Sequence, residues 1–438
     1  MTDDKFYRRL PYYRLLAAGL IAIVVTTCCV QQIARRDGDP EVFVTAARSL
    51  LQGRDIYLIP SQHARFYYYP PFFACLNIPL TLLPISVVIV LWALASVALL
   101  GWSMTTFYSS MTGRPFFSLP IKTRWVLSFF SILLTARFIF LHLRFGQANI
   151  FVLALTVLGL KWLNSKQQVR AGVAIALSIV VKLTTLPFGF WFLARRSWRV
   201  LLGLCLGGLL GLMLPALVVG VRQDISYHRE WVATVALANQ AGTGNWANSG
   251  NVSLRAQVDR FFIKTDAFEY HGRLYRVTLV ELPPVVVRLI GQLLMLGVAL
   301  AIVLYAVRFR HAPELVAQWG GFAFVFSLIP NFSPVAEIPH LVILLPAYLY
   351  VVHLWYVEQL KDRIFRRLVV LSFVFATLTT NTIVGMYLSR LLTSWGCINL
   401  GLLLLSAAIF RAATCLRRER RGTDDARLAR APDAATTA

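Results

Sequence analysis

A few residues that could take part in chemistry stand among or beside the long apolar runs of this 438-residue chain. Asp39 and Glu41 follow the first run, and a carboxylate there can accept a proton from a hydroxyl group. Lys182 lies inside another apolar stretch, and its ammonium group can stabilise developing negative charge. His340 stands at the start of a later run and can transfer a proton. Because ionisable residues at membrane depth are costly and usually functional, the sequence predicts that these groups converge on one site.

The composition points to a membrane fold. Hydrophobic residues make up 58% of the chain and charged residues 14%, with a mean hydropathy of +0.64, whereas about a quarter of the residues of a soluble domain are charged. Runs of about 20 apolar residues span the hydrocarbon core as helices, because lipid offers no other partner for the backbone. We predict an all-α polytopic membrane protein with about 12 transmembrane helices. Crossings are expected near residues 15–33, 71–108, 125–141, 150–163, 171–194 (a broken pair with residues 182–187 at its tip), 200–219, 285–307, 315–329, 341–357, 368–388 and 394–409.

The net charge of +23 indicates topology rather than a nucleic-acid surface. Lys and Arg gather in short connections between apolar runs, for example at Arg195, Arg196 and Arg199. The positive-inside rule places such connections in the cytoplasm, together with residues 1–14 and the tail over residues 413–438, which is basic and then, from Gly422, polar enough to be disordered. The other connections are then external.

The expected domain plan follows from this alternation. A multi-pass membrane domain extends over residues 15–412, with its main external loops at about residues 35–70 and 220–284. We predict a plasma (inner) membrane protein whose active site lies on the extracytoplasmic face.

The first external loop contains a predicted amphipathic helix over residues 40–51, with Phe43, Ala47, Leu50 and Leu51 along one side. Such a helix is expected to lie along the membrane surface. Asp39, immediately before it, is in a position typical of an N-cap. Helix capping is therefore the structural alternative to a catalytic role for this carboxylate.

Four sequence motifs follow one another on the same predicted side of the membrane. They are Asp39-Pro-Glu with Gly53, Tyr57 and Tyr69-Pro-Pro-Phe72, then Gly146-Gln-Ala-Asn149, then Lys182-Leu-Thr-Thr-Leu-Pro187 with the basic turn at residues 195–199, and last Asn251-Val-Ser-Leu254 with Ser333-Pro334, His340 and Leu345-Pro346. Together they resemble glycosyltransferase family 87 over about residues 15–350. One feature differs, because the family often has an aromatic residue and paired histidines after the Ser-Pro, whereas Glu337, Ile338 and Pro339 precede His340 alone here.

The resemblance implies a GT-C-type architecture whose external loops form the active site. It also implies an inverting hexosyltransferase, in the simplest case a mannosyltransferase, that moves a sugar from polyprenyl phosphate to a lipid-linked or cell-envelope glycan. A lipid-carried donor suits an external site because nucleotide sugars are cytoplasmic, and the sequence has neither a soluble domain nor a glycine-rich phosphate loop. No cofactor, metal ion or nucleic acid is expected.

Within this scheme Asp39 is the base that deprotonates the acceptor hydroxyl, with Glu41 and then Asp37 as the next candidates, and His340 orients the phosphate or moves a proton. The donor-phosphate candidates are Lys182, Arg144 and Arg260, and the sugar- or acceptor-binding candidates are Gln147, Asn149, Asn251 and Trp231, with Trp246 as a second aromatic. Each type has a structural alternative: cations extend to lipid headgroups, amides cap helices, a lone histidine packs in a core, and tryptophan anchors at the interface. Asp37-Gly-Asp39 also matches the Asp-x-Asp pattern that binds a metal–nucleotide pair in soluble glycosyltransferases, but so short a pattern arises by chance.

Two other functional classes remain open at this stage. A secondary transporter or flippase for lipid-linked sugars would place ionisable residues on discontinuous helices at mid-membrane, whereas here they fall in the external connections. An inactive structural subunit of an envelope complex would tolerate changes at Asp39.

Overall fold

The computed structural model describes residues 3–58, 60–61, 65–237 and 247–428, and it is almost entirely helical over these ranges. Trp246 lies outside the described residues. Eight helices in the described ranges are long and apolar enough to cross a membrane, which is consistent with an all-α membrane protein. These segments are α1 (Asp3–Arg35), α4 (Ile85–Thr112), α5 (Ile121–Phe145), α9 (Trp198–Met213) with α10 (Ala216–Val219), α13 (Pro284–Arg308), the π-helix η7 (Leu315–Gly320) with α14 (Gly321–Phe332), the 3-10 helix η8 (Ile338–Leu344) with α15 (Leu345–Tyr356), and α19 (Cys397–Leu428).

Shorter apolar helices stand between these segments: α6 (Asn149–Asn164), α7 (Gln168–Val181), and the 3-10 turn η3 (Leu183–Thr185) with α8 (Pro187–Ala194). The helical pair predicted over residues 171–194 is confirmed, because α7 ends at Val181 and Lys182 adopts an extended backbone. Pro187 opens α8, where its missing N–H removes no helical hydrogen bond. The total of about 12 crossings stays a prediction.

The core lies where α14 and α15 run through the middle of the helix bundle. In the most apolar 18-residue stretch of each segment, 83% of the residues are buried for η7 with α14 and 89% for η8 with α15. The corresponding share for α1, at the periphery, is 17%. Outer helices such as α9 and α13 expose rows of leucines, as expected for surfaces that face lipid.

Helix α7 packs closely against α9 at two glycines. A Cβ on Gly172 would lie 2.1 Å from the Val200 carbonyl oxygen, and a Cβ on Gly203 would lie 2.1 Å from that of Val169. Small residues at such crossings let two backbones approach and gain van der Waals contact where lipid provides no hydrophobic drive. This contact holds α7, the helix of the broken pair that precedes Lys182, in place.

The single span predicted over residues 368–388 is wrong, because that stretch is divided. It contains α16 (Arg363–Ala376), α17 (Asn381–Val384) and α18 (Met386–Ser394). Arg137 of α5 donates to the Ala376 carbonyl at 3.2 Å, and the Thr377 hydroxyl donates to the Leu134 carbonyl at 2.7 Å. These distant partners satisfy the end of α16, so the helix stops inside the apolar run.

The helix predicted over residues 40–51 exists as α2 (Asp39–Leu51), but its apolar side faces protein rather than lipid. Phe43, Ala47 and Leu50 are fully buried. The Phe43 ring lies 5.0 Å from that of Phe73 and 5.2 Å from that of Trp92, centroid to centroid. The segment that follows α1 is therefore bound to the helix bundle, where it can present Asp39 in a fixed position.

The remaining elements are short. They are α3 (Pro71–Leu76), η1 (Ile78–Leu82), η2 (Phe116–Ser118), α11 (Val221–Trp231) with the π-helix η4 (Val232–Leu237), α12 (Leu254–Phe262), and the antiparallel strands β1 (Phe268–Tyr270) and β2 (Arg273–Tyr275), which pair in the register Phe268↔Tyr275. The long loop predicted over residues 220–284 is thus partly structured.

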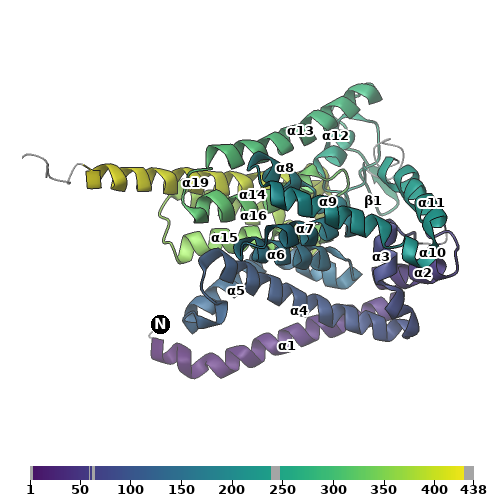
Figure 1. The fold of residues 1–438 in the computed structure, drawn as a ribbon, viewed down its shortest axis with the longest axis horizontal. Helices are drawn as coiled ribbons and strands as arrows, with labels where there is room; N and C mark the ends of the chain where they lie inside the picture. The colour runs from purple at the N-terminus through teal and green to yellow at the C-terminus, as the bar shows by residue number, and fades with distance from the viewer. Residues whose placement is uncertain (1–2, 59, 62–64, 238–246, 429–438) are drawn as a thin grey trace, which may run out of the picture.

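The two ends of the described chain lie at the same end of the bundle. Figure 1 shows the start of α1 and the far end of α19 on the left, while α2, α3, α10 and α11 gather on the right. This arrangement agrees with the even number of crossings expected from the basic connections. Helix α19 continues to Leu428, so the tail that we predicted to be disordered from Gly422 begins as helix, and its last residues lie outside the described ranges.

Candidate functional site

The break between α7 and α8 places Lys182 at the centre of a polar cluster. Its Nζ donates to Asn149 Oδ1 at 2.9 Å and lies 2.8 Å from His340 Nε2. The same ammonium group lies 5.2 Å from the ring centroid of Tyr69, within cation–π range. Three sequence candidates from three different helical segments therefore meet here.

Glu337 is linked to Lys182 and Asn149 through Gln147. Gln147 Nε2 donates to Glu337 Oε2 at 2.8 Å, and Asn149 Nδ2 donates to Gln147 Oε1 at 2.7 Å. The Glu337 N–H donates to His340 Nδ1 at 3.2 Å, while Glu337 Oε2 lies 3.7 Å from His340 Nε2. Gln147 and Asn149 thus use their amides to bridge side chains. Neither is the N-cap of α6, a position that belongs to Ala148.

The contacts of His340 tie its tautomer to the state of Lys182. When Nδ1 accepts from the Glu337 N–H, a neutral ring carries its proton on Nε2 and donates to Lys182, which can accept only as an uncharged amine. In the other tautomer Lys182 donates to Nε2. Protonation of these two residues is therefore coupled through one short contact.

Asp39, the first residue of α2, lies close enough to Glu337 and Lys182 for electrostatic interaction. The N-cap of this helix is Gly38, so the capping alternative does not describe the Asp39 side chain. Asp39 Oδ1 lies 3.3 Å from Arg65 Nη1, and the Asp39 side chain is 13% exposed. Burial raises the pKa of Asp39 to about 6, a rise that the charge of Arg65 opposes and that of Glu337 reinforces. At neutral pH this carboxylate is ionised, and it is a stronger base than an ordinary aspartate.

Arg144 holds the segment before Asp39 in place. Its guanidinium donates to both carboxylate oxygens of Asp37, at 2.8 and 2.6 Å, and these hydrogen bonds hold the pKa of Asp37 below its usual range. Arg65 also donates to the Asp37 carbonyl oxygen. Such a bidentate pair is strong and directional, so Arg144 and Arg65 together fix the approach to α2.

Gly146 allows this approach. It ends α5 in a left-handed conformation with φ of +65°, and a Cβ there would lie 2.7 Å from Pro40 Cδ and 2.9 Å from Gln32 Oε1. The turn that carries Gln147 therefore touches the start of α2, and only glycine fits both the dihedral angle and the space.

Arg260 and Asn251 form a separate, structural unit behind the cluster. The fully buried Arg260 guanidinium donates to the carbonyls of Ala247, Asn248 and Asn251 at 3.2, 2.9 and 2.8 Å, to that of Ser394 at 3.3 Å, and to Gln257 Oε1 at 2.7 Å. Asn251 Oδ1 accepts from the N–H groups of Ser253 and Ala336 at 3.1 and 3.0 Å. The structure does not bring Arg260 to Lys182. Arg260 and Asn251 instead order the backbone that leads to Glu337.

Two further sequence candidates lie at the edge of the site. Trp231, partly exposed on α11, donates to the Tyr68 carbonyl at 3.2 Å and so holds the chain next to Tyr69. Glu41 is partly exposed on the first turn of α2, and none of the hydrogen bonds or ion pairs described for residues 3–58 joins it to the Lys182 cluster.

The structure adds two residues to the cluster for which we predicted no specific role. Glu337 stands three positions before His340, a spacing typical of paired side chains at a helix start, and this signal could have identified it. His142 of α5 is fully buried, lies close enough to Lys182 and His340 for electrostatic interaction, and has no hydrogen-bond partner for either ring nitrogen among the described residues. Nothing in the sequence around His142 indicated that it would lie there.

The arrangement offers the largely buried carboxylate of Asp39, one lysine at a break between apolar helices, and the amides of Asn149 and Gln147, which link this lysine to Glu337. Within the described ranges, no three His, Cys, Asp or Glu side chains are placed to hold a metal ion. The cluster can accept a proton at Asp39 and hydrogen-bond an anionic group at Lys182.

One comparison with known proteins gives a match. Residues 67–329, more than half of the chain, match the family model for glycosyltransferase family 87. The matched range includes Gln147, Asn149 and Lys182, whereas Asp39 and His340 lie outside it. No curated protein and no solved structure matches the chain.

Proposed function

Because the chain belongs to glycosyltransferase family 87, we propose that it is an inverting hexosyltransferase that takes mannose from polyprenyl phosphate. The acceptor is a lipid-linked or cell-envelope glycan on the extracytoplasmic face of the plasma membrane. The observation that carries this proposal is the polar cluster in which Lys182, held by Asn149 and His340 at 2.9 and 2.8 Å, acts electrostatically on the buried Asp39.

The proposed reaction is one displacement. Asp39 accepts the proton of an acceptor hydroxyl as the oxygen of that hydroxyl attacks the anomeric carbon. The bond from this carbon to the phosphate oxygen breaks, and the phosphate leaves with the electron pair. The Lys182 ammonium hydrogen-bonds the departing oxygens, where charge develops. Attack from the face opposite the leaving group inverts the anomeric configuration.

The surroundings of Lys182 support a lipid-carried donor. The lysine lies where α7 gives way to η3, with apolar sequence on both sides. Leu183 and Leu186 beside it are 47% and 40% exposed, which offers an apolar surface next to the ammonium group. A polyprenyl chain could lie along that surface while its phosphate reaches Lys182.

The charge distribution supports an extracytoplasmic site. The end of the bundle away from the cluster carries Arg195, Arg196 and Arg199 after α8, Arg308 as the last residue of α13, and Arg310 after it. Basic residues favour the cytoplasmic side, which puts the cluster on the other side. The position of both chain ends in Figure 1 agrees with this orientation.

The test is transfer of label from radiolabelled polyprenyl-phosphate mannose in membranes that contain the protein and its native acceptor. Asp39→Asn should slow transfer about 10²–10⁴-fold at equal abundance, the range for loss of a general base. Asp266→Asn is a matched control, because Asp266 is a partly exposed residue that pairs with Arg276 at 2.6 Å outside the cluster, and it should leave the rate unchanged.

The other results separate the alternatives. Equal transfer by Asp39→Asn and wild type would remove Asp39 from the mechanism and direct attention to Glu41 or Asp37. Absence of transfer with wild type, in detergent without a gradient and with each candidate donor sugar, would contradict the enzyme assignment. Uptake or flipping of the lipid-linked sugar in sealed vesicles would then favour the transporter.

A further inference from the structure

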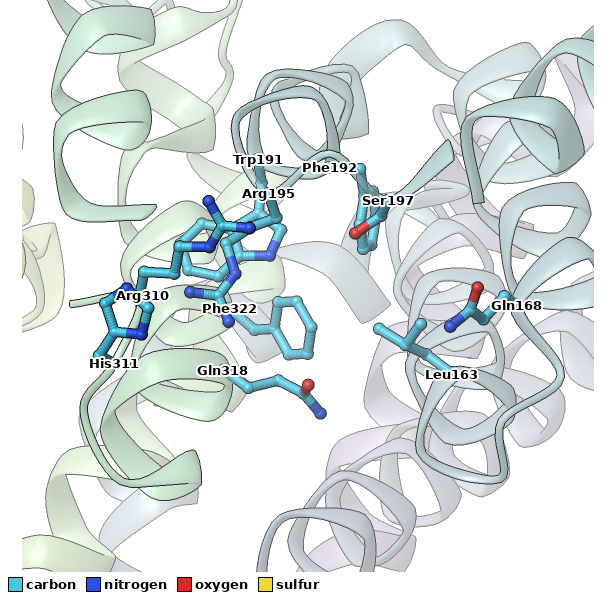
Figure 2. Close-up of a pocket in the computed structure, with 10 residues that line it drawn as sticks. All are labelled: Leu163, Gln168, Trp191, Phe192, Arg195, Ser197, Arg310, His311, Gln318 and Phe322. Carbon is cyan, nitrogen blue, oxygen red and sulfur yellow. The ribbon is translucent and has the colours of Figure 1, made fainter. Parts of the chain in front are cut away.

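A cavity of about 350 Å³ lies at the end of the bundle away from the polar cluster. Figure 2 shows Arg195 and Arg310 next to each other on one side of it, and Leu163 and Gln168 on the opposite side. Gln168 is the first residue of α7, and Lys182 follows the last residue of this 14-residue helix. The rise of an α-helix separates the two by about 20 Å, so the cavity is distinct from the proposed active site.

Two arginines face this cavity without an acidic partner. Arg195 directly follows α8, its Nη1 donates to the Ala306 carbonyl at 3.4 Å, and its guanidinium lies 5.8 Å from the Trp191 ring centroid. Burial and the positive charge of Arg310 both lower the pKa of Arg195. Within the described residues, neither arginine forms an ion pair with a carboxylate. Two like charges held together in a half-enclosed space repel each other, and an anion between them would reverse that cost.

Among the described residues, Glu314, the acidic residue nearest to Arg310 in the sequence, does not pair with the two arginines. Glu314 is exposed, and its Oε1 lies 3.5 Å from Gln318 Nε2, the amide that also lines the cavity. The described contacts of Glu314 therefore lead to Gln318 and not to the arginines.

Two helices also begin at this cavity. Gln168 opens α7, and Ser197 is the N-cap of α9, where its side chain makes no capping hydrogen bond. The first N–H groups of a helix carry partial positive charge and bind anions. The Ser197 hydroxyl is thus available to a ligand, and His311 contributes a further donor on the arginine side.

The remaining walls are apolar. Trp191 and Phe322 lie beside the arginines, and Leu163 lies opposite. The neighbouring helices α9 and α13 expose leucines such as Leu202 and Leu304, at 53% and 56%, and so face lipid. A phosphate diester with an apolar body fits this combination of charge and aromatic surface better than a small hydrated ion does.

We propose that this cavity binds the phosphate of an anionic membrane lipid, with Arg195 and Arg310 as its main ligands. The shared chemistry is a phosphate group, which an anionic phospholipid headgroup or free phosphate could supply. The apolar walls and the adjoining lipid-facing helices favour the phospholipid. The site depends on neither Asp39 nor sugar transfer, so it can be tested whether or not the proposed reaction is correct.

The experiment measures the midpoint of thermal unfolding of the full chain in neutral detergent with added phosphatidylglycerol, phosphatidylcholine or inorganic phosphate. Phosphatidylglycerol should raise the midpoint of wild type saturably, and phosphatidylcholine should not. The variant Arg195→Gln/Arg310→Gln should lose this response. Arg199→Gln, which removes an exposed arginine outside the cavity lining, should keep it.

A second variant keeps the test decisive if the double variant does not fold. Ser197→Asp retains an N-cap residue and puts a carboxylate beside the two arginines. It should unfold at a higher temperature than wild type without lipid and no longer respond to phosphatidylglycerol. A saturable rise with inorganic phosphate alone would support the site and identify free phosphate as its source. Equal responses to phosphatidylglycerol in wild type and Ser197→Asp would overturn the proposal. So would the absence of any response of wild type to both phosphatidylglycerol and inorganic phosphate.

Discussion

Lys182, which is partly buried, and Arg260, which is fully buried, are two cations at the same end of the bundle, yet their surroundings differ in kind. Lys182 contacts side chains, namely Asn149, His340 and the ring of Tyr69. Arg260 contacts mainly backbone carbonyls, among them those of Asn248 and Ser394. The sequence made both residues candidates for the donor phosphate and favoured Lys182, because apolar residues flank it closely.

The difference shows what separates a scaffold cation from a ligand-binding one. The carbonyls that accept from Arg260 belong to the backbone of a loop and of the end of α18, so they cannot rotate away, and a change of partner at Arg260 would leave buried acceptors such as that of Ala247 without this donor. Side chains around Lys182 can rotate and exchange one partner for a ligand. A cation whose partners are side chains at a helix break is therefore the better candidate for binding a phosphate.

The largest effect should come from removing the scaffold cation. Arg260→Met removes a donor from four backbone carbonyls, and those of Ser394 and Asn248 keep a second donor. Each buried acceptor that loses its donor costs about 1–3 kcal/mol, so the free energy of unfolding should fall by about 3 kcal/mol. The abundance of folded protein and the midpoint of thermal unfolding measure this. The control Arg273→Met removes an exposed arginine from the nearby hairpin and should change neither. If Arg260→Met is stable but has a raised KM for the donor, the contrast with Lys182 is wrong.

Lys182→Met should show the reverse pattern. We expect transfer to fall about 10²-fold, the scale of losing one donor to a developing oxyanion, while the unfolding midpoint changes little. Lys182→Arg should restore part of the rate, because it keeps a cation that can reach the phosphate. Lys161→Met, an exposed lysine in the last turn of α6, is the control for removing a lysine from the same bundle. A normal rate in Lys182→Met would exclude this lysine as a phosphate ligand.

The pH dependence of transfer should follow Asp39. Burial raises the pKa of Asp39 to about 6, and the base must be ionised, so the rate should fall about tenfold per unit below this pH. Asp37 makes a useful comparison, because its hydrogen bonds with Arg144 lower its pKa, so Asp37 does not titrate near pH 6. Asp37→Asn should therefore keep the limb near pH 6. A limb near pH 4 in wild type would contradict a buried base.

The smallest effect separates two glycines with the same backbone conformation. Gly146 and Gly113 both end helices with left-handed φ, +65° and +68°, but a Cβ on Gly113 would have no atom within 4 Å. Gly113→Ala should cost about 1 kcal/mol for the dihedral angle alone. Gly146→Ala should cost more because it meets Pro40, and it should also slow transfer by displacing Gln147. Equal unfolding midpoints and rates for the two variants would show that the contact with α2 is unimportant.

Much of the fold could be predicted because its signals are local. Long apolar runs, the break at Lys182 before Pro187, and the α2 helix all appear in short stretches of sequence and are present in the structure. The division of residues 368–388 was missed because its cause is remote: Arg137 and Leu134 of α5 bond to the end of α16.

The sequence by itself determined that the chain is helical and apolar, and its motifs placed it in the right family, since segments that face lipid must satisfy their own backbone and family motifs are local. Only the tertiary structure decided which of the polar residues work together. It paired Arg144 with Asp37 and enclosed Arg260 in carbonyls, and it placed Glu337 against Gln147, 190 positions away. Hydrogen bonds depend on distance in space, and no spacing along the chain records which helix ends will meet.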